Sequence, residues 1–282
     1  MANDANVVVI TGASGGIGAA LARRLGEEGL RLALAARREA QLREVADDAE
    51  ARGAAGTLVF PADVTRREDV LQLRDTALHA FGRIDVWVNN AGRGIARSVL
   101  DLTEAEVDAM IDVNVKSALY GMQAAVQYFI RRGGAGHVVN VSSFLGRVPI
   151  ASFRSAYSAA KAALNSLTTN LRMDLREYPG IHVSLVMPGV VATDFARNVV
   201  GEPRPSLTTA GSPQTAEEVA EIIARVIKRP VPEIYTNPAS AAAVRQFYAD
   251  PAAFADRLGA LPAAAPPRES VSRERPSPPP SA

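Results

Sequence analysis

The stretch TGASGGIG at Thr11–Gly18 decides the fold, because it joins an apolar run, NVVVI at 6–10, to a segment with helical spacing at 19–29. Glycines let the backbone turn sharply and approach a phosphate, whose charge exposed N–H groups and the helix dipole then stabilise. The order strand, glycine turn, helix therefore predicts a phosphate-binding loop, although its glycines do not have G-x-G-x-x-G spacing. A glycine-rich turn without a ligand is the alternative.

Short aliphatic or β-branched runs recur along the chain and alternate with stretches of helical period. Most are continuous apolar runs, which is the pattern of strands covered on both faces in a parallel sheet. Thr103 and Thr215 each open a capping box ahead of a helical segment. The sequence predicts an α/β fold, a Rossmann-like doubly wound parallel sheet of about seven strands with helices on both faces. The expected strands are 6–10, 31–36, 56–60, 84–88, 136–141, 181–186 and 232–236.

Composition narrows the classes of function. The chain has 282 residues, 48% of them apolar, and a net charge of +1, so it shows no electrostatic footprint for nucleic acid or an anionic membrane. It has no cysteine, and its three histidines lack metal-ligand spacing, so no metal site is predicted. No leader or membrane-spanning run is found, which favours the cytoplasm. We expect a small-molecule partner.

The chain is predicted to form one domain over 1–258, followed by a tail over 259–282. Seven of its last 21 residues are proline, and such a segment buries too little apolar surface to offset its ordering entropy. A disordered tail is expected, with a Pro-rich recognition ligand as the alternative. Residues 194–214 have the composition of a lid over a substrate. Residues 239–258 are expected to form one helix, or two broken at Pro251.

Further motifs follow the glycine string T-G-x-x-x-G-x-G in order: NNAG at 89–92, Asn114, VSS at 141–143, YSAAK at 157–161 and PGVVAT at 188–193. Together they resemble the short-chain dehydrogenase/reductase family over residues 6–200. The resemblance implies an NAD(P)-dependent enzyme that acts on CH–OH and C=O groups. It also implies a homodimer or homotetramer.

The resemblance assigns cofactor contacts residue by residue. They fall on the glycine loop, on the ends of later strands and on the Tyr–Lys pair. These residues are Gly12, Ser14, Gly16, Ile17, Gly18, Asp63, Val64, Asn90, Ala91, Gly92, Tyr157, Lys161, Pro188, Gly189, Val191 and Thr193.

The end of the second expected strand bears on the choice of nicotinamide cofactor. An acidic residue there would accept hydrogen bonds from the adenosine ribose. The chain instead has Arg37 and Arg38, and guanidinium groups beside a ribose attract a 2′-phosphate. NADP(H) is therefore preferred, with NAD(H) possible. In the alternative, the two arginines begin a solvated helix turn.

Tyr157 and Lys161 stand four residues apart, so they share one face of a helix. A cation near a phenol favours the phenolate, and so does a positive nicotinamide ring, which predicts a lowered pKa for Tyr157. A helix-surface pair is the alternative for an isolated Tyr-x-x-x-Lys.

The family resemblance implies that Ser143 polarises a carbonyl, with Ser142 as the second candidate. It also implies that Asn114 holds a water that links Lys161 to solvent. A buried asparagine paired with a backbone group is the alternative. Five apolar side chains are candidates for the pocket or for plain core: Phe144, Val148, Phe153, Val190 and Phe195.

The sequence thus predicts an oxidoreductase that transfers a hydride between NADP(H) and a carbonyl or secondary alcohol, as a ketone or aldehyde reductase. The catalytic residues are Asn114, Ser143, Tyr157 and Lys161. Two alternatives stay open: an NAD-dependent alcohol dehydrogenase, and a non-catalytic protein that senses the dinucleotide.

Overall fold

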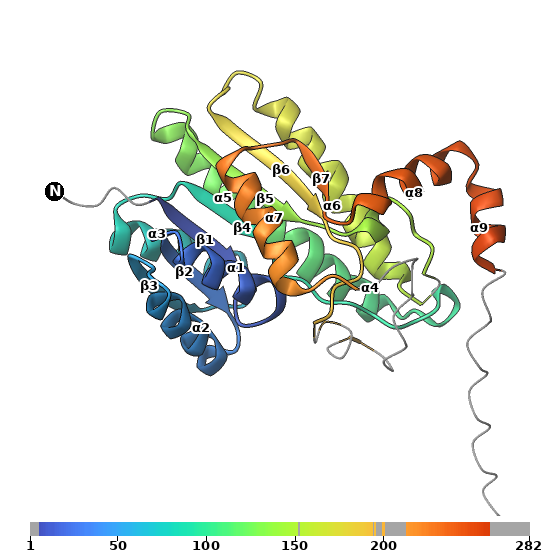
Figure 1. Ribbon diagram of the computed structural model, residues 1–282, viewed down its shortest axis with the longest axis horizontal. Helices are drawn as coiled ribbons and strands as arrows, with labels where there is room; N and C mark the ends of the chain where they lie inside the picture. The colour runs from blue at the N-terminus through green and yellow to red at the C-terminus, as the bar shows by residue number, and fades with distance from the viewer. Residues whose placement is uncertain (1–5, 152, 194, 196–198, 201–212, 260–282) are drawn as a thin grey trace, which may run out of the picture.

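A parallel seven-stranded sheet runs through the middle of the molecule in the order β3-β2-β1-β4-β5-β6-β7 (Figure 1). The computed structural model describes residues 6–151, 153–193, 195, 199–200 and 213–259. The strands are β1 (Val7–Thr11), β2 (Arg31–Ala36), β3 (Gly56–Pro61), β4 (Val86–Asn89), β5 (Gly136–Val141), β6 (Ile181–Met187) and β7 (Glu233–Tyr235).

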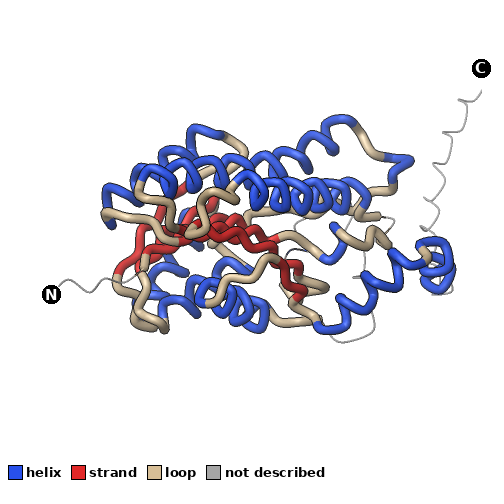
Figure 2. The backbone as a smooth tube through the Cα atoms, turned by 90° about the horizontal axis from the view of Figure 1, so that it is seen from above, coloured by secondary structure: helices blue, strands red, loops and turns tan. Residues whose placement is uncertain are grey.

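Helices cover both faces of this sheet, as Figure 2 shows from above. Apolar side chains of α1, α2 and α7 pack on one face, and those of α3, α5 and α6 pack on the other. The helices are α1 (Gly16–Gly26), α2 (Glu39–Ala51), α3 (Arg67–Phe81), α4 (Glu104–Ile111), α5 (Ser117–Arg131), α6 (Ser155–Asp174), α7 (Ala216–Lys228), α8 (Pro238–Ala249) and α9 (Pro251–Gly259). Three short turns complete the fold: η1 (Val99–Asp101), η2 (Asp112–Lys116) and η3 (Phe144–Gly146).

The core follows from the alternation of side chains along each strand. Val8 and Ile10 of β1 pack with α1 and α7, whereas Val9 between them packs with Trp87 on the opposite face. All four are fully buried. Apolar residues on both faces explain why the strands are continuous apolar runs in the sequence.

The predicted fold class is confirmed, and the expected strands lie close to the observed ones. The fourth begins at Val86, two residues later than expected, and the seventh at Glu233, one residue later. Both predicted capping boxes, at Thr103 and Thr215, are present. The chain also breaks at Pro251, between α8 and α9, as expected.

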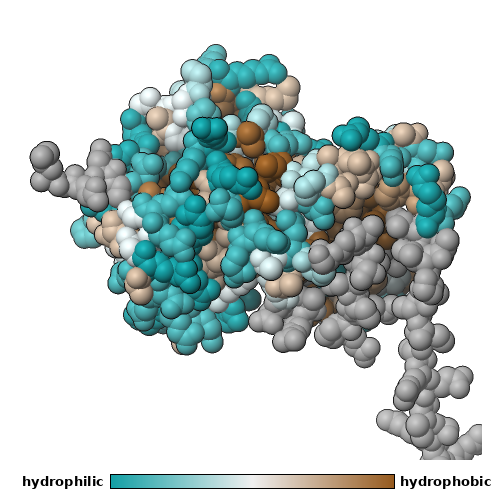
Figure 3. Space-filling model, in the orientation of Figure 1, coloured by the Kyte–Doolittle hydropathy of each residue, from teal (hydrophilic) through white to brown (hydrophobic). Residues whose placement is uncertain are grey.

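Other expectations fall wholly or largely on residues that the structure leaves out. The predicted tail lies outside the described residues from 260 on, and so does most of the predicted lid at 194–214. The division into a domain and a tail therefore stays a prediction. Among the described helices, none combines the length and the apolar composition needed to cross a membrane. On the face seen in Figure 3, the surface over α2 is mainly hydrophilic.

Candidate active site

Many of the predicted site residues lie at or just after the carboxyl ends of parallel strands, whereas Asn114, Tyr157 and Lys161 lie on helical segments. β1 and β4 are neighbours in the sheet but not in the sequence, so the strand order reverses between them. Crevices at such switch points are where open α/β sheets bind ligands. The glycine loop follows β1, the NNAG motif begins in β4, and Ser142 and Ser143 follow β5.

The glycine loop has the geometry of a phosphate cradle. Gly12 and Gly16 have φ angles of 68° and 53°, a region that side-chain-bearing residues rarely adopt. A Cβ on Gly18 would lie 2.6 Å from Asn90 Nδ2 and would also collide with the Gly12 carbonyl oxygen. No side chain caps the first turn of α1, which leaves its N–H groups directed at the loop. These features fit the pyrophosphate of a dinucleotide.

Asn90 joins the end of β4 to the glycine loop. Its Nδ2 donates to the carbonyl oxygens of Thr11 and Gly12, at 3.0 and 3.2 Å. The Thr11 hydroxyl accepts hydrogen bonds from the N–H groups of Asn90 and Ala91. Asn90 and Ala91 therefore set the width of the crevice between β1 and β4.

Of the two arginines after β2, only Arg38 lies against the glycine loop. Its Nη2 donates to the Ser14 carbonyl at 3.1 Å, and its Nε donates to the Ser14 hydroxyl at 3.3 Å. Arg37 is exposed, and no side-chain contact is recorded for it among the described residues. Of these two arginines, Arg38 is therefore the one placed to contact a 2′-phosphate beside this loop.

Asp63 and Val64 follow β3, the outermost strand. They therefore lie at the same end of the strands as Arg38, which follows β2. One carboxylate oxygen of Asp63 accepts hydrogen bonds from the N–H and the hydroxyl of Thr65. The Val64 side chain is buried in the core. Any adenine contact at Val64 therefore falls to its backbone.

Ser143, Tyr157 and Lys161 come together at the end of β5. The Ser143 hydroxyl lies close enough to the Tyr157 hydroxyl to lower the pKa of the phenol by hydrogen bonding. Lys161 Nζ lies 5.8 Å from the centre of the Tyr157 ring and donates to the Val141 carbonyl at 3.0 Å. Tyr157 and Lys161 are only 7% and 3% exposed, so the pair is not a solvated helix surface.

The electrostatics of this pair differ from the prediction. Burial raises the pKa of Tyr157 to about 12, and the Ser143 hydrogen bond and the Arg154 charge offset this only in part. Burial also lowers the pKa of Lys161 to about 8. The expected lowering of the Tyr157 pKa is therefore wrong for the protein's own groups, because desolvation disfavours both charged forms.

The structure separates Ser142 from Ser143. The Ser142 hydroxyl donates to Asn165 Oδ1 at 2.6 Å and also lies against the Lys161 carbonyl oxygen. Both partners belong to α6, so this buried hydroxyl holds β5 and α6 together. The Ser143 hydroxyl bonds to Tyr157 and also accepts from the Leu145 N–H at 3.2 Å. Only Ser143 lies beside the tyrosine hydroxyl.

Asn114 lies in the π-helical turn η2 between α4 and α5, not within a regular helix. Its Nδ2 donates to the carbonyls of Arg93 and Met110, and its Oδ1 accepts from the Arg93 N–H. A Cβ on Gly92 would lie 2.9 Å from Asn114 Oδ1 and 3.5 Å from Lys161 Nζ. Asn114 thus has the predicted backbone partners and also lies near Lys161.

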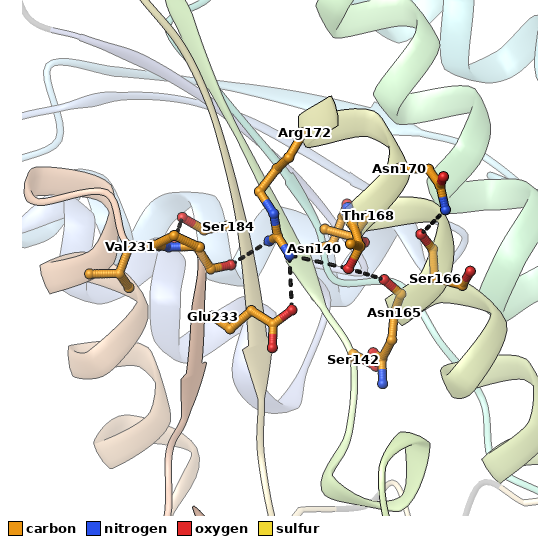
Figure 4. Close-up of polar contacts among 12 residues, drawn as sticks. Asn140, Ser142, Asn165, Ser166, Thr168, Asn170, Arg172, Ser184, Val231 and Glu233 are labelled. Atoms are coloured by element: carbon orange, nitrogen blue, oxygen red, sulfur yellow. Dashed lines mark hydrogen bonds and ion pairs between the residues drawn. The ribbon is translucent and has the colours of Figure 1, made fainter. Parts of the chain in front are cut away.

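Polar contacts fix α6, which carries Tyr157 and Lys161, against the sheet (Figure 4). Asn140 Nδ2 in β5 donates to the Thr168 hydroxyl at 2.9 Å, within the buried core. Arg172 near the end of α6 forms an ion pair with Glu233 of β7 at 2.8 Å. These contacts set the position of the helix and therefore of Tyr157.

The segment after β6 contacts both the glycine loop and η3. The Pro188 carbonyl accepts from the Phe144 N–H at 2.8 Å, and Val191 pairs with Gln214 in an isolated bridge. A Cβ on Gly16 would lie 3.5 Å from the Thr193 side chain. Gly189 lies beside Asn237 at the start of α8.

Ile17, in the first turn of α1, packs partly against the core.

Two of the apolar pocket candidates belong to a separate cluster. Phe144 and Val148 are buried with Phe254 of α9. In contrast, the Phe195 ring lies 5.5 Å from the Tyr157 ring. The sequence analysis missed Arg154, which is buried close to these two rings. Its place three residues before Tyr157 is the signal that could have found it.

Comparison with known proteins identifies the family. The model of the short chain dehydrogenase family matches residues 6–203, most of the chain. The chain belongs to the short-chain dehydrogenase family. This short-chain dehydrogenase is 38% identical over 190 residues to the uncharacterized oxidoreductase YxnA of Bacillus subtilis, covering 67% of this chain and 53% of YxnA. The match thus spans about half the length of YxnA. An uncharacterized Staphylococcus aureus oxidoreductase, MW2403, is 36% identical over 66% of this chain and 78% of its own.

Solved structures give the same picture. A short-chain dehydrogenase/reductase from Burkholderia phymatum, in complex with NAD, has a TM-score of 0.78 and 30% identity, over 88% of this chain and 94% of that one. An alcohol dehydrogenase from Thermococcus sibiricus, complexed with 5-hydroxy-NADP, has a TM-score of 0.71 and 30% identity, over 82% and 96%. The predicted family and enzyme class, an oxidoreductase acting on CH–OH and C=O groups, are confirmed for this short-chain dehydrogenase.

Proposed function

We propose that this short-chain dehydrogenase reduces ketones or aldehydes with NADPH. The observation that carries the proposal is the buried cluster of Ser143, Tyr157 and Lys161 at the end of β5. Two neighbouring hydroxyls can both donate to one carbonyl oxygen once the substrate oxygen takes the place of the contact between them. The proposal treats the protein as a cytoplasmic homodimer or homotetramer, in keeping with the family resemblance.

The cofactor preference rests on Arg38. Its guanidinium lies beside Ser14 on the glycine loop, with no acidic residue at the end of β2 to accept bonds from ribose hydroxyls. A planar guanidinium binds phosphate oxygens in pairs, which supports NADP(H). Solved neighbours include complexes with a modified NADP and with NAD.

In the proposed mechanism, Ser143 holds and polarises the substrate oxygen while Tyr157 gives it a proton. Lys161, about one helical turn away, provides positive charge beside the resulting phenolate and reaches toward the ribose. Asn114 holds the Arg93 backbone next to Lys161 and supports proton exchange with solvent. The nicotinamide supplies the hydride when it is bound. In the reverse direction Tyr157 accepts the proton of an alcohol.

The remaining assigned residues hold the dinucleotide. The loop from Gly12 to Gly18 receives the pyrophosphate, and Asp63 with Val64 borders the adenine. Asn90, Ala91 and Gly92 line the crevice at β4. Pro188, Gly189, Val191 and Thr193 frame the carboxamide.

An NAD-linked alcohol dehydrogenase is the second candidate, and the NAD complex of the Burkholderia phymatum protein favours it. A non-catalytic dinucleotide sensor is the third. Fluorescence titration with NADPH and NADH separates the first two, because comparable affinity for both would remove the role of Arg38 in cofactor choice.

A panel of ketones and aldehydes, assayed by loss of NADPH absorbance, tests the reaction itself. We expect turnover of at least one carbonyl compound by the wild-type protein and none above background by Tyr157→Phe. A protein that binds NADPH but reduces no carbonyl and oxidises no alcohol is a sensor, and the proposal then fails.

A further inference from the structure

Arg154 lies at the N-terminus of α6, three residues before Tyr157. Residues at i and i+3 are neighbours on one face of a helix, so the guanidinium lies on the same side of α6 as the phenol. The backbone of this segment is fixed, because the Arg154 N–H donates to the Ala151 carbonyl and its carbonyl accepts from the Ser158 N–H. Its charge acts on Tyr157 and favours the phenolate.

The guanidinium is buried, and no described residue is its acidic partner. Arg154 is 8% exposed, and its Nη1 donates to the Ile95 carbonyl at 3.1 Å. Within the described part of the chain, no carboxylate forms an ion pair with it. The neighbouring Arg97 does have one, because it is paired with Glu106 at 3.0 Å. A guanidinium has five N–H donors, and among the described residues only Nη1 of Arg154 has an acceptor.

Burial of a charge is costly unless an opposite charge or hydrogen bonds compensate for it. Burial lowers the pKa of Arg154, which nevertheless stays positively charged at any physiological pH. The site therefore holds a fixed positive charge that the described residues do not neutralise. The first turn of α6 adds to it, since it contains no acidic residue and no side-chain cap.

The guanidinium lies near the aromatic ring that contacts Tyr157. A Cβ on Gly94 would lie 2.8 Å from Arg154 Nη1 and 2.9 Å from the Phe195 ring. The Phe195 ring in turn lies 5.5 Å from the Tyr157 ring. Because Gly94 has no side chain, the guanidinium and the Phe195 ring pack directly against its backbone.

We propose that Arg154 binds a carboxylate of the substrate, so that the carbonyl compound reduced at Tyr157 is a short-chain oxo acid. The inference rests on the proposed carbonyl reductase function. The guanidinium fork matches the two oxygens of a carboxylate. One positive charge that the described residues leave unpaired balances one carboxylate, whereas a phosphate dianion calls for more. Because Arg154 and Tyr157 are helix neighbours, only a few bonds separate the carboxylate from the carbonyl.

A purely structural Arg154 is the competing interpretation. The bond to the Ile95 carbonyl, together with the bridge between Arg97 and Arg154, ties the chain after β4 to α6. A structural arginine would affect the stability of the protein but not its choice between charged and neutral substrates. The ratio of kcat/KM for an acid to that for its ester separates these roles.

The test compares pyruvate, acetoacetate and laevulinate with their methyl esters, using NADPH. Variants are Arg154→Met and Arg154→Lys, and Arg176→Met serves as an exposed control just beyond α6. We expect wild type to prefer at least one acid over its ester. In Arg154→Met the acid-to-ester ratio should fall by about tenfold or more, in Arg154→Lys by less, and in Arg176→Met not at all.

A second readout covers a variant that folds poorly. With NADP⁺ present, the preferred oxo acid should raise the melting temperature of wild type more than that of Arg154→Lys. If wild type reduces neutral carbonyls but no oxo acid, or if the acid-to-ester ratio is unchanged in both Arg154 variants, the carboxylate role is wrong while the reductase function stands. If wild type reduces no carbonyl at all, the proposed function fails and the carboxylate role falls with it.

Discussion

The Arg38 guanidinium lies over the glycine loop, with Nη2 3.1 Å from the Ser14 carbonyl oxygen. A Cβ on Gly15 would lie 2.9 Å from the same nitrogen, so a glycine at this position lets the arginine approach the loop. Arg38, which follows β2, thereby reaches the glycine loop that follows β1. This contact is the physical basis for the proposed preference for NADP(H).

Replacing Arg38 tests that preference. In Arg38→Ala, the Kd for NADPH should rise by about tenfold to a hundredfold, because charge-assisted hydrogen bonds to a 2′-phosphate are lost. The Kd for NADH should change little. Fluorescence titration measures both, and Arg43→Ala on the exposed face of α2 is the matched control. An equal loss for the two cofactors would show that Arg38 only supports the loop.

Tyr157→Phe removes the proposed proton donor and keeps the ring against Phe195. We expect kcat to fall by about a thousandfold or more, since a positioned acid contributes a factor of about 10²–10⁴. NADPH affinity and melting temperature should stay close to those of wild type. Steady-state kinetics and titration check these values together, and a variant with normal turnover would rule out the phenol as the acid.

The two serines after β5 should behave differently. Ser143→Ala should lower kcat by about a hundredfold, because it removes a donor to the substrate oxygen. Ser142→Ala should instead lower the stability by about 1–3 kcal/mol, because Asn165 Oδ1 loses the buried hydroxyl that donates to it at 2.6 Å. Kinetics and urea unfolding of both variants give the answer, and the reverse pattern would make Ser142 the polarising residue.

Gly18→Ala tests the close packing behind the phosphate loop. The added Cβ would lie 2.6 Å from Asn90 Nδ2 and would press on the Gly12 carbonyl. The loop must shift, so we expect NADPH affinity to fall by about tenfold or more and the melting temperature to fall as well. Gly133→Ala separates backbone strain from steric collision. The φ of Gly133 is 110°, which strains an alanine, but its added Cβ meets no atom within 4 Å. That variant should lose stability and keep its NADPH affinity.

The buried His137 should make the free energy of unfolding depend on pH. Burial, helped by the nearby exposed His182, lowers its pKa from 6.5 to about 4. Between these values the unfolded chain binds a proton that the folded chain does not. The contribution of His137 is therefore complete above pH 6.5 and is lost as the pH falls toward about 4, by on the order of 3 kcal/mol. Denaturant unfolding at several pH values measures it.

His137→Gln, which cannot titrate, should flatten the curve of unfolding free energy against pH in this window. His79→Gln, an exposed histidine in α3, should leave the slope as in wild type. Equal slopes for wild type and His137→Gln would contradict the prediction.

Local sequence predicted most of the fold. The run Val7–Ile10 is apolar at every position because both faces of β1 are buried, and the capping boxes at Thr103 and Thr215 depend only on residues three positions apart. The pairing of Tyr157 with Lys161 also follows from helix geometry alone. Such features could be predicted because the interactions that create them lie within one element.

The tertiary structure alone decided features that depend on distant residues. Ser142 and Ser143 are adjacent in sequence, and only the packing of α6 on β5 buries one against Asn165 and leaves the other beside Tyr157. The pKa of Tyr157 likewise depends on burial by several elements, which outweighs the neighbouring cation. The lack of an acidic partner for Arg154 among the described residues also depends on which chain segments surround it. Spacing along a chain specifies local contacts, whereas burial and charge balance depend on the whole folded molecule.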